Sequence, residues 1–379
     1  MNILFLCNEY PPFISGGIGV FTKELSVELT KLGHKIYVLG AYPNIKNKQI
    51  EVVNNITIIR INKKTGLIGE LENRIRIYIN AKKIIEENKI DIVETQDFNG
   101  PLAFYPKFKS HTLVRLHGSV TYFNQLSYNV SKKKKIKNFL WHVLESSSFK
   151  NADNIVSVSN FTSQKTKEIF NIKKNIPTIY NGIPLIQNYI QKSSFDEIKK
   201  FVFAGSIIEK KGILELIDAW IELDKHHKNI HLDVYGKDTE GLVKTITNIL
   251  NKNNCNSVKI HPPVVKSDLL KIYNNADFCI YPSKAEAFSL APMEAMSMSK
   301  VVLYTDQTSA SELVNDSNGF LIEKCSVNKI YNCLTKALSL SIPEYNKISH
   351  AAFTTIKDNF SIDILTKKNI EYYQLIINK

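Results

Sequence analysis

Hydrophobic positions along the chain follow two alternating spacings. A continuous apolar run covers residues 3–7, and from Ile18 to Leu32 apolar residues recur every three or four positions until Gly33. A second continuous run follows at 35–40. The pattern predicts a strand, a helix and a strand, with Gly16 and Gly17 at the helix entrance, where the backbone can closely approach a phosphate.

The same alternation continues through the first half of the chain. Further strands are predicted at 57–61, 91–94, 112–116, 154–158 and 178–180, with helical patterns such as 70–87 between them. Such alternation is typical of a parallel sheet covered by helices on both faces. Its ligand crevice is expected at the carboxyl ends of the strands, where the loops 8–9, 95–97 and 117–119 carry polar residues.

A second domain is predicted after a stretch with little periodicity at 184–192. Its strands are expected at 201–204, 231–236, 257–260, 277–281, 301–303 and 318–323, and its first helix at 213–223. A chain of 379 residues exceeds one ordinary hydrophobic core. We therefore expect domains at 1–185 and 186–361, followed by an amphipathic helix at 362–379.

Composition narrows the class of protein. Hydrophobic residues make up 44% and charged residues 22%, as in soluble globular proteins, and no apolar run approaches the roughly 20 residues that span a bilayer. The amino terminus lacks a basic segment and ends its apolar run at Pro11 and Pro12, which predicts a first strand rather than a signal peptide, and a cytoplasmic location. The five cysteines have no paired spacing, so neither disulfides nor a zinc site is expected.

A net charge of +13 indicates an anionic partner, although a genome bias toward lysine could also raise this number. No nucleic-acid-binding motif is present, which leaves an anionic membrane and a phosphorylated ligand as the expected partners. The segment Tyr122–Leu144 combines Lys132 to Lys135 with an aromatic, amphipathic pattern. It is expected either to attach peripherally to an anionic membrane or to form a solvated helix face.

Two carboxylates and an expected anion-binding turn follow the strand at 277–281. Glu286 should lie in a loop, and Glu294 in the first turn of a helix that Pro292 helps to begin. The amides of Phe288, Ser289 and Leu290 should then be donors at the helix start. Carboxylates suit sugar and ribose hydroxyls, and amides suit a diphosphate, so a sugar nucleotide is the expected ligand. Glu294 could instead serve only to stabilise the helix dipole.

This stretch resembles the signature of the retaining glycosyltransferases of family four, a GT-B family. The signature P-S-x-x-E-x-F-x-L-x-x-x-E-A-M is matched by Pro282, Ser283, Glu286, Phe288, Leu290, Glu294, Ala295 and Met296. The resemblance covers nearly the whole chain. It implies an α/β GT-B fold, in which two Rossmann-like domains face each other across a cleft and the last helix returns to the first domain.

The resemblance also implies roles for single residues. Gly16 and Gly17 would lie against the donor diphosphate, although a glycine-rich turn after a first strand can also mark a dinucleotide fold. That alternative is disfavoured because the glycines come late and no acid ends the second strand. His117, in the run RLHGS, would contact the donor sugar, and Lys211 the diphosphate. Ser206 stands where the family usually has arginine, so Lys210 or a residue of the other domain would have to compensate.

The expected function is retaining transfer of a sugar from a UDP- or GDP-linked donor to a glycan or lipid-linked acceptor, in cell-surface polysaccharide or lipopolysaccharide synthesis. Glu286, His117 and Lys211 are the expected catalytic residues. The expected acceptor-side residues are Asn8, Asp97 and Ser119. No cofactor or metal is expected, because the chain has no Asp-x-Asp motif. A sugar-nucleotide epimerase or hydrolase, or an inactive sugar-nucleotide- or membrane-binding module, remains the alternative.

Overall fold

The computed structural model describes residues 1–13, 16–126 and 132–378, and they form two compact units. Unit 1 comprises Met1–Pro184 and Ile362–Lys379, and unit 2 comprises Leu185–Ser361. The boundaries expected at 185/186 and 361/362 lie within one residue of this division. Among the described residues, no helix is both long and apolar enough to cross a membrane.

Unit 1 is built on a seven-stranded sheet within the described residues, with the strand order β3-β4-β2-β1-β5-β6-β7. The strands are β1 (Asn2–Leu6), β2 (Lys35–Tyr42), β3 (Gln49–Val53), β4 (Ile56–Asn62), β5 (Ile92–Gln96), β6 (His111–Leu116) and β7 (Asn154–Ser157). All neighbours are parallel except β3, which pairs antiparallel with β4 at the edge. The carboxyl ends of the parallel strands therefore meet at one edge of the sheet, where a ligand crevice is expected.

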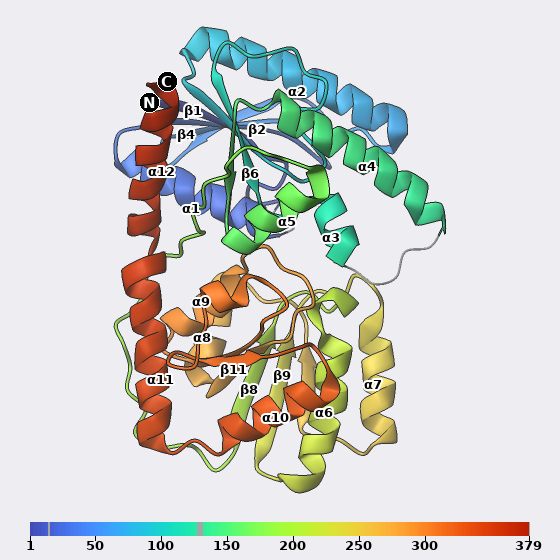
Figure 1. Cartoon of the computed structure of the whole chain (residues 1–379), viewed down its shortest axis with the longest axis vertical. Helices are drawn as coiled ribbons and strands as arrows, with labels where there is room; N and C mark the ends of the chain where they lie inside the picture. The colour runs from blue at the N-terminus through green and yellow to red at the C-terminus, as the bar shows by residue number, and fades with distance from the viewer. Residues whose placement is uncertain (14–15, 127–131, 379) are drawn as a thin grey trace. The chain divides into compact units, whose positions relative to one another are not determined.

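Helices cover both faces of this sheet. They are α1 (Gly17–Lys31), α2 (Gly66–Asn88), α3 (Val120–Leu126), α4 (Lys132–Asn151), α5 (Asn160–Phe170) and α12 (Ile362–Ile377) (Figure 1). Side chains alternate between the faces of a strand: Ile3 and Phe5 of β1 pack in one core with α1 and α12, and Leu4 and Leu6 in another with α2 and α4. The carboxyl-terminal helix thus completes the first core.

Unit 2 holds a six-stranded parallel sheet, in the order β10-β9-β8-β11-β12-β13 within the part of the chain described. Its strands are β8 (Lys199–Ala204), β9 (Ile230–Tyr235), β10 (Val258–His261), β11 (Phe278–Tyr281), β12 (Val301–Thr305) and β13 (Phe320–Ile322). Its helical elements are η1 (Glu209–Lys211), α6 (Ile213–His226), α7 (Leu242–Lys252), α8 (Lys266–Asn275), α9 (Leu290–Ser297), η2 (Ser309–Glu312), α10 (Val327–Leu338), α11 (Ile342–Thr355) and the π-helical turn η3 (Ile356–Phe360).

The strand β11 separates two layers of unit 2. Phe278 and Ile280 face the core shared with α6, α7 and α10. On the other face, the hydroxyl of Tyr281 lies 3.0 Å from the Tyr273 hydroxyl of α8 and 3.1 Å from the Ala291 carbonyl oxygen of α9. Each unit is therefore a parallel sheet between helices, as the periodicity predicted.

Two local expectations were wrong. Residues 178–180 form no strand, because only Thr178 makes an isolated bridge, to Ser157. The strand β3 was not predicted, although Ile50 and Val52 alternate there with Gln49 and Glu51. The alternation is only four residues long, the shortest run that indicates a strand, and the strand is exposed and held to β4 by backbone pairing.

Candidate functional site

Glu286 lies in the loop between β11 and α9 of unit 2. Its carboxylate forms an ion pair with Lys211, the last residue of η1, and accepts a hydrogen bond of 3.0 Å from the Ser283 hydroxyl. The Glu286 side chain is 11% exposed, so this carboxylate is largely withdrawn from water. The structure therefore brings together, at the carboxyl ends of β8 and β11, the two unit 2 residues expected to be catalytic.

Tight backbone packing fixes Lys211 beside Glu286. Gly212 follows Lys211 with a φ of +69°, and a Cβ atom there would lie 2.0 Å from the Pro282 carbonyl oxygen. The Lys284 amide also donates to the Lys210 carbonyl at 2.8 Å. Only glycine accommodates both this conformation and this approach.

The charges around Glu286 are balanced by two lysines. Burial would raise the pKa of Glu286, but Lys211, Lys210 and the Ser283 hydroxyl together lower it below its ordinary value. Burial lowers the pKa of Lys210, and Glu286 partly offsets that effect. Lys210 is therefore a second cation beside the Glu286 carboxylate. It belongs to the same unit as Ser206, which stands where the family usually has arginine.

Glu294 lies on α9, at its fifth residue, and forms an ion pair with Lys266 at 3.3 Å. The expectation that it would lie in the first turn was wrong, because the helix begins at Leu290 and its first turn holds no acid. Helix-dipole stabilisation therefore does not account for Glu294. Lys266 was missed by the sequence reasoning, since it follows β10 and no local pattern relates it to α9.

The expected diphosphate-binding turn coincides with the start of α9. Ser289 is the N-cap residue, and its side chain makes no capping hydrogen bond. Phe288 is buried, and its ring lies 5.6 Å from that of Phe360 in η3. This aromatic contact packs the start of α9 against η3.

In unit 1, the carboxyl groups of two buried acidic residues hold the loop that carries His117. Asp97 accepts hydrogen bonds from the His117 amide at 2.9 Å and from the Gly118 amide at 3.1 Å. Glu145 of α4 accepts from the amides of Val120 at 2.8 Å and Thr121 at 3.1 Å. These two carboxyl groups accept from the amides on either side of the loop and so fix its conformation.

The His117 imidazole is held in its neutral form. Burial, together with the charge of Arg115, lowers the pKa of His117 to about 3. Its ring packs edge-on against Phe21 of α1, with 4.8 Å between the ring centres. Burial also raises the pKa of Asp97 to about 8, although the two loop amides act in the opposite direction. A neutral imidazole can donate a hydrogen bond to a sugar hydroxyl through one ring nitrogen and accept one through the other.

Gly16 and Gly17 lie at the start of α1, where Gly16 is the N-cap residue. A Cβ atom added to Gly17 would meet nothing within 4 Å, so the backbone is open to approach there. Gly19 differs, because its Cβ would lie 2.0 Å from the Glu9 carbonyl oxygen. A Cβ atom at Gly16 would lie 3.5 Å from a Glu9 carboxylate oxygen, so Gly17 is the more open of the first two glycines, and Gly19 allows the helix to pack against the loop after β1.

Asp97 and Ser119 do not fit the expected acceptor-side role. Both are fully buried; Asp97 holds the loop amides, and the Ser119 hydroxyl accepts from the Tyr122 amide at 3.1 Å, which caps α3. Sequence position placed them after strands, but both side chains turn inward. Asn8 is exposed, and its amide oxygen accepts from the Ala41 amide at 2.8 Å.

Asn8 also lines a pocket of about 70 Å³ at the carboxyl ends of β1, β2 and β5. Its walls combine the amides of Asn8 and Gln96, the rings of Phe98 and Tyr105, and the cation of Lys63. Amides and aromatic rings are suited to the polar edges and apolar faces of sugars. The described residues contain no group of three or more His, Cys, Asp or Glu side chains placed to hold a metal ion.

Comparison with known proteins identifies the family. The family description "Glycosyl transferases group 1" matches residues 186–355, and "Glycosyltransferase Family 4" matches residues 15–187. The chain belongs to these glycosyltransferases. A relative in Methanocaldococcus jannaschii, the uncharacterized glycosyltransferase MJ1069, is 28% identical over 408 residues, which cover 100% of this chain and 98% of the relative.

Two further similarities extend this family assignment. The Staphylococcus aureus capsular polysaccharide biosynthesis glycosyltransferase CapM is 25% identical over 262 residues, covering 65% of this chain and 68% of CapM. The Anabaena protein HepE, solved in complex with UDP and glucose, superposes with a TM-score of 0.74 at 16% identity, covering 99% of each chain. The similarity to CapM supports the glycosyltransferase assignment, and the superposition on HepE, together with the two sheets, supports the GT-B fold.

Proposed function

We propose that this glycosyltransferase moves a sugar, with retention of configuration, from a UDP- or GDP-linked donor to a glycan or lipid-linked acceptor of cell-surface polysaccharide or lipopolysaccharide synthesis. The observation that carries the proposal is the buried Glu286 carboxylate, balanced by Lys211 and Lys210 beside the start of α9. The kinship with CapM and with HepE, which binds UDP and glucose, supports it.

The catalytic task is to stabilise a diphosphate leaving group and an electron-poor sugar carbon, and preorganised donors are usually the largest contribution. Lys211 and the amides of Phe288 to Leu290 would bind the diphosphate, with the Gly16–Gly17 backbone as a further donor. A bound diphosphate would share Lys211 with Glu286, freeing that carboxylate to accept hydrogen bonds from the donor sugar. Glu294 would bind the ribose, and His117 a sugar hydroxyl.

Donor screening of the purified protein tests this function. The protein is incubated with UDP-, GDP- and ADP-sugars. Release of nucleotide only when acceptor is added indicates a transferase. An isomerised sugar indicates an epimerase, and binding without turnover indicates an inactive module. Glu286→Gln should abolish transfer, whereas Glu323→Gln, on an exposed side chain, should not. Wild-type turnover in Glu286→Gln would refute the assignment.

Two chemical details of the proposal have their own tests. The anomeric configuration of the first product, followed by proton NMR, distinguishes retention from inversion. We propose that transfer needs no divalent metal, on the absence of an Asp-x-Asp motif. Loss of activity in EDTA that manganese restores would refute this.

We propose that the acceptor binds at the pocket of Asn8, Gln96 and Phe98 in unit 1. Phe98→Ala should raise the acceptor KM by about two- to tenfold, since aromatic packing contributes roughly 0.5–1.5 kcal/mol, and should leave the donor KM unchanged. Phe104→Ala is the matched control, because Phe104 lies on the same loop, is 70% exposed and does not line the pocket. Equal acceptor KM values in both variants would exclude the pocket.

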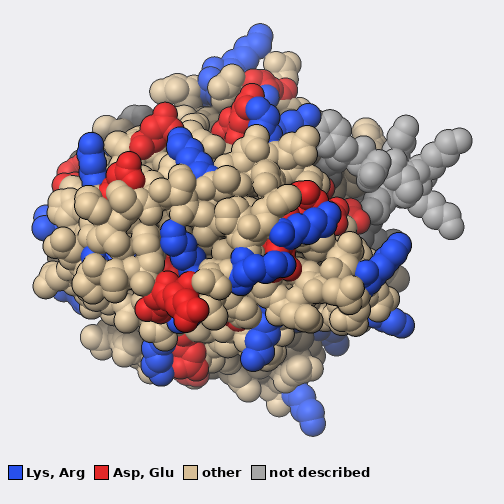
Figure 2. Space-filling view, turned by 90° about the horizontal axis from the view of Figure 1, so that it is seen from below, with Lys and Arg blue, Asp and Glu red and all other residues tan. Residues whose placement is uncertain are grey.

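We also propose peripheral attachment to the cytoplasmic face of an anionic membrane through Tyr122–Leu144. Phe139, Leu140 and Val143 are exposed on α4 and support the proposal, whereas Tyr122 is wholly buried and takes no part. Residues 127–131 and the side chains of Lys132 to Lys135 lie outside the described part of the chain. The face drawn in Figure 2 carries basic and acidic side chains intermingled.

Liposome sedimentation tests this attachment. The wild type should bind vesicles that contain anionic lipid, and binding should weaken with salt because charges are screened beyond about 8 Å at physiological ionic strength. Changing all four lysines, Lys132 to Lys135, to Gln should weaken it further. Equal, salt-insensitive sedimentation of both proteins would exclude the segment.

A further inference from the structure

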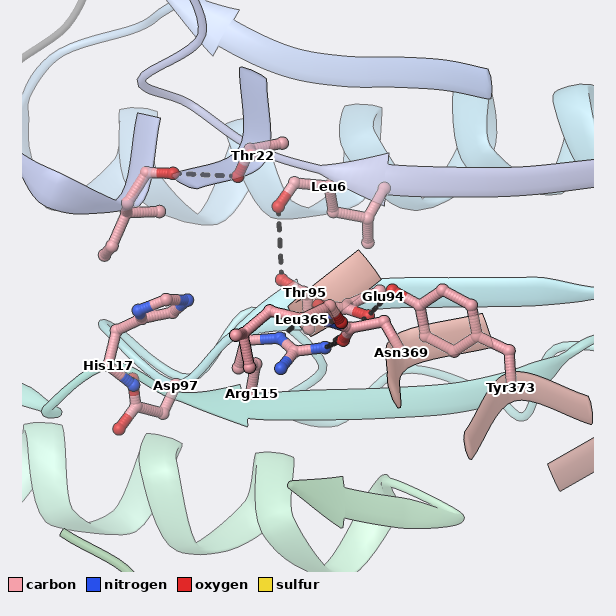
Figure 3. A network of polar contacts seen from close by, with 11 residues as sticks. Leu6, Thr22, Glu94, Thr95, Asp97, Arg115, His117, Leu365, Asn369 and Tyr373 are labelled. Carbon is pink, nitrogen blue, oxygen red and sulfur yellow. Dashed lines mark hydrogen bonds and ion pairs between the residues drawn. The ribbon is translucent and has the colours of Figure 1, made fainter. Parts of the chain in front are cut away.

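A buried polar network lies beneath the His117 loop in unit 1. Arg115 of β6 is 1% exposed, and its Nε and Nη2 donate to the Glu94 carboxylate of β5 at 2.6 and 3.3 Å. The pair is shown at the centre of Figure 3. Buried ion pairs are costly to desolvate and add little to stability compared with apolar packing, so this pair calls for another explanation.

The carboxyl-terminal helix α12 completes the network. The Tyr373 hydroxyl donates to the second Glu94 oxygen at 2.5 Å, and the Asn369 side-chain oxygen accepts from Arg115 Nη2 at 2.6 Å. Figure 3 shows both side chains reaching the pair from α12. Helix α12 thus bonds to each member of the ion pair.

The network extends to the His117 imidazole through one aromatic ring. The Arg115 guanidinium lies 4.9 Å from the centre of the Phe21 ring, and the His117 ring lies 4.8 Å from the same centre. Arg115 and His117 are two residues apart at the end of β6, and Figure 3 shows their side chains on one side of it. A shift of Arg115 would therefore displace the surface on which the imidazole rests.

Arg115 has no access to a substrate. The cavity lined by Phe21, Glu94, Arg115 and His117 measures about 10 Å³, which is room for about one water molecule. A diphosphate or sugar does not fit, so this guanidinium is not a direct ligand. Its charge is fixed by Glu94 and acts only on its neighbours.

We propose that Tyr373 and Asn369 are positioning residues that set the place of the His117 imidazole through Glu94 and Arg115. In this way the last helix of the chain contributes to a site built at the end of β6. The helix starts at Ile362, whose amide donates to the Ile183 carbonyl at 2.9 Å and ties the helix start to unit 1. The catalytic consequence rests on the proposed function, whereas the structural coupling does not.

A pair of adjacent tyrosines provides the test of this coupling. Tyr373→Phe removes the bond to Glu94, and Tyr372→Phe, the matched control, removes a 3.4 Å bond to the Ile155 carbonyl. In protein labelled with ¹³C-histidine, the His117 ring resonance, assigned with His117→Gln, should move in Tyr373→Phe and stay in Tyr372→Phe. Asn369→Ala should move it as well. An unmoved resonance in Tyr373→Phe and Asn369→Ala overturns the proposal, with or without a known substrate.

Kinetics test the catalytic consequence. Tyr373→Phe should lower kcat about tenfold, in line with the sensitivity of catalysis to small displacements, and leave the donor KM unchanged. In a His117→Ala background, Tyr373→Phe should lower kcat no further. An equal fall in both backgrounds refutes action through His117. A failure of the proposed function is distinct: no donor would be turned over, or Glu286→Gln would keep full activity.

Discussion

Removal of the Lys211 ammonium tests the electrostatic design of the unit 2 site. Lys211→Met keeps most of the aliphatic stem but leaves Glu286 without its ion-pair partner. Removing one partner of a buried pair costs about 3–5 kcal/mol. Because Lys210 and Ser283 remain beside Glu286 and the Lys211 side chain is 21% exposed, we expect unit 2 to lose about 2 kcal/mol of unfolding free energy at pH 7.

The sign of the pH dependence follows from the pKa of Glu286. In the wild type this pKa is lowered, so the ionised carboxylate contributes stability above the unfolded pKa, and the contribution is lost as pH falls through the lowered folded pKa. In Lys211→Met the charge of Lys211 no longer opposes the effect of burial, so the pKa of Glu286 is higher than in the wild type. As pH falls, Glu286 is therefore protonated in the variant before it is protonated in the wild type, and this removes the cost of its buried charge. The difference in unfolding free energy between the two proteins should narrow as pH falls from 7 toward 4.5.

Urea unfolding measures this gap in unit 2. The chain has two tryptophans, so a Trp141→Phe background leaves Trp220, buried in the unit 2 core, as the fluorescent reporter. The double variant Lys211→Met/Glu286→Gln should recover at least half of the loss, because it removes both members of the Lys211–Glu286 ion pair. Lys266→Met, which removes the partner of Glu294, is the control for loss of a lysine near α9.

One pair of results would refute the reasoning. If Lys211→Met and the double variant were equally unstable, and the gap to the wild type were the same at pH 7 and 5, the loss would come from packing. The Glu286 carboxylate would then not depend on Lys211 for its charge.

Three further predictions concern backbone, histidine and thiols. Gly212→Ala should destabilise unit 2 by at least about 2 kcal/mol, because the new Cβ meets the Pro282 carbonyl, whereas Gly241→Ala, with φ +75° and open space, should cost about 1 kcal/mol in urea unfolding; equal losses would contradict the clash. The His117 ring, with a pKa of about 3, should show no NMR titration between pH 7 and 4.5. The unfolded chain takes up that proton first, so His117 lowers stability as pH falls below about 6.5. All five cysteines are free and four are buried, so Ellman's reagent at pH 8 should react slowly before denaturation and with all five after it; rapid native reaction would contradict this burial.

Local sequence was sufficient to predict most of the secondary structure and the fold class. Apolar spacing decides whether a segment becomes a strand or a helix, since each has a fixed period of buried positions. It predicted β1, α1 and β2 and the second domain's strands, and the signature around Glu286 supported the family. The exposed strand β3 escaped because its alternation of Ile50 and Val52 with polar residues is only four residues long, too short to stand out.

Tertiary structure decided which polar residues are free to meet a ligand. Asp97 and Ser119 follow strands, as site residues do, yet Asp97 accepts from amides of the His117 loop and Ser119 from an amide of α3. Conversely, the partners Lys266 and Tyr373 are distant in sequence from the groups they contact. Periodicity reports only which face of an element is buried. Which side chains meet inside the protein depends on how separate elements pack, and the packing brings Tyr373 of the last helix onto Glu94 and Arg115 beneath His117.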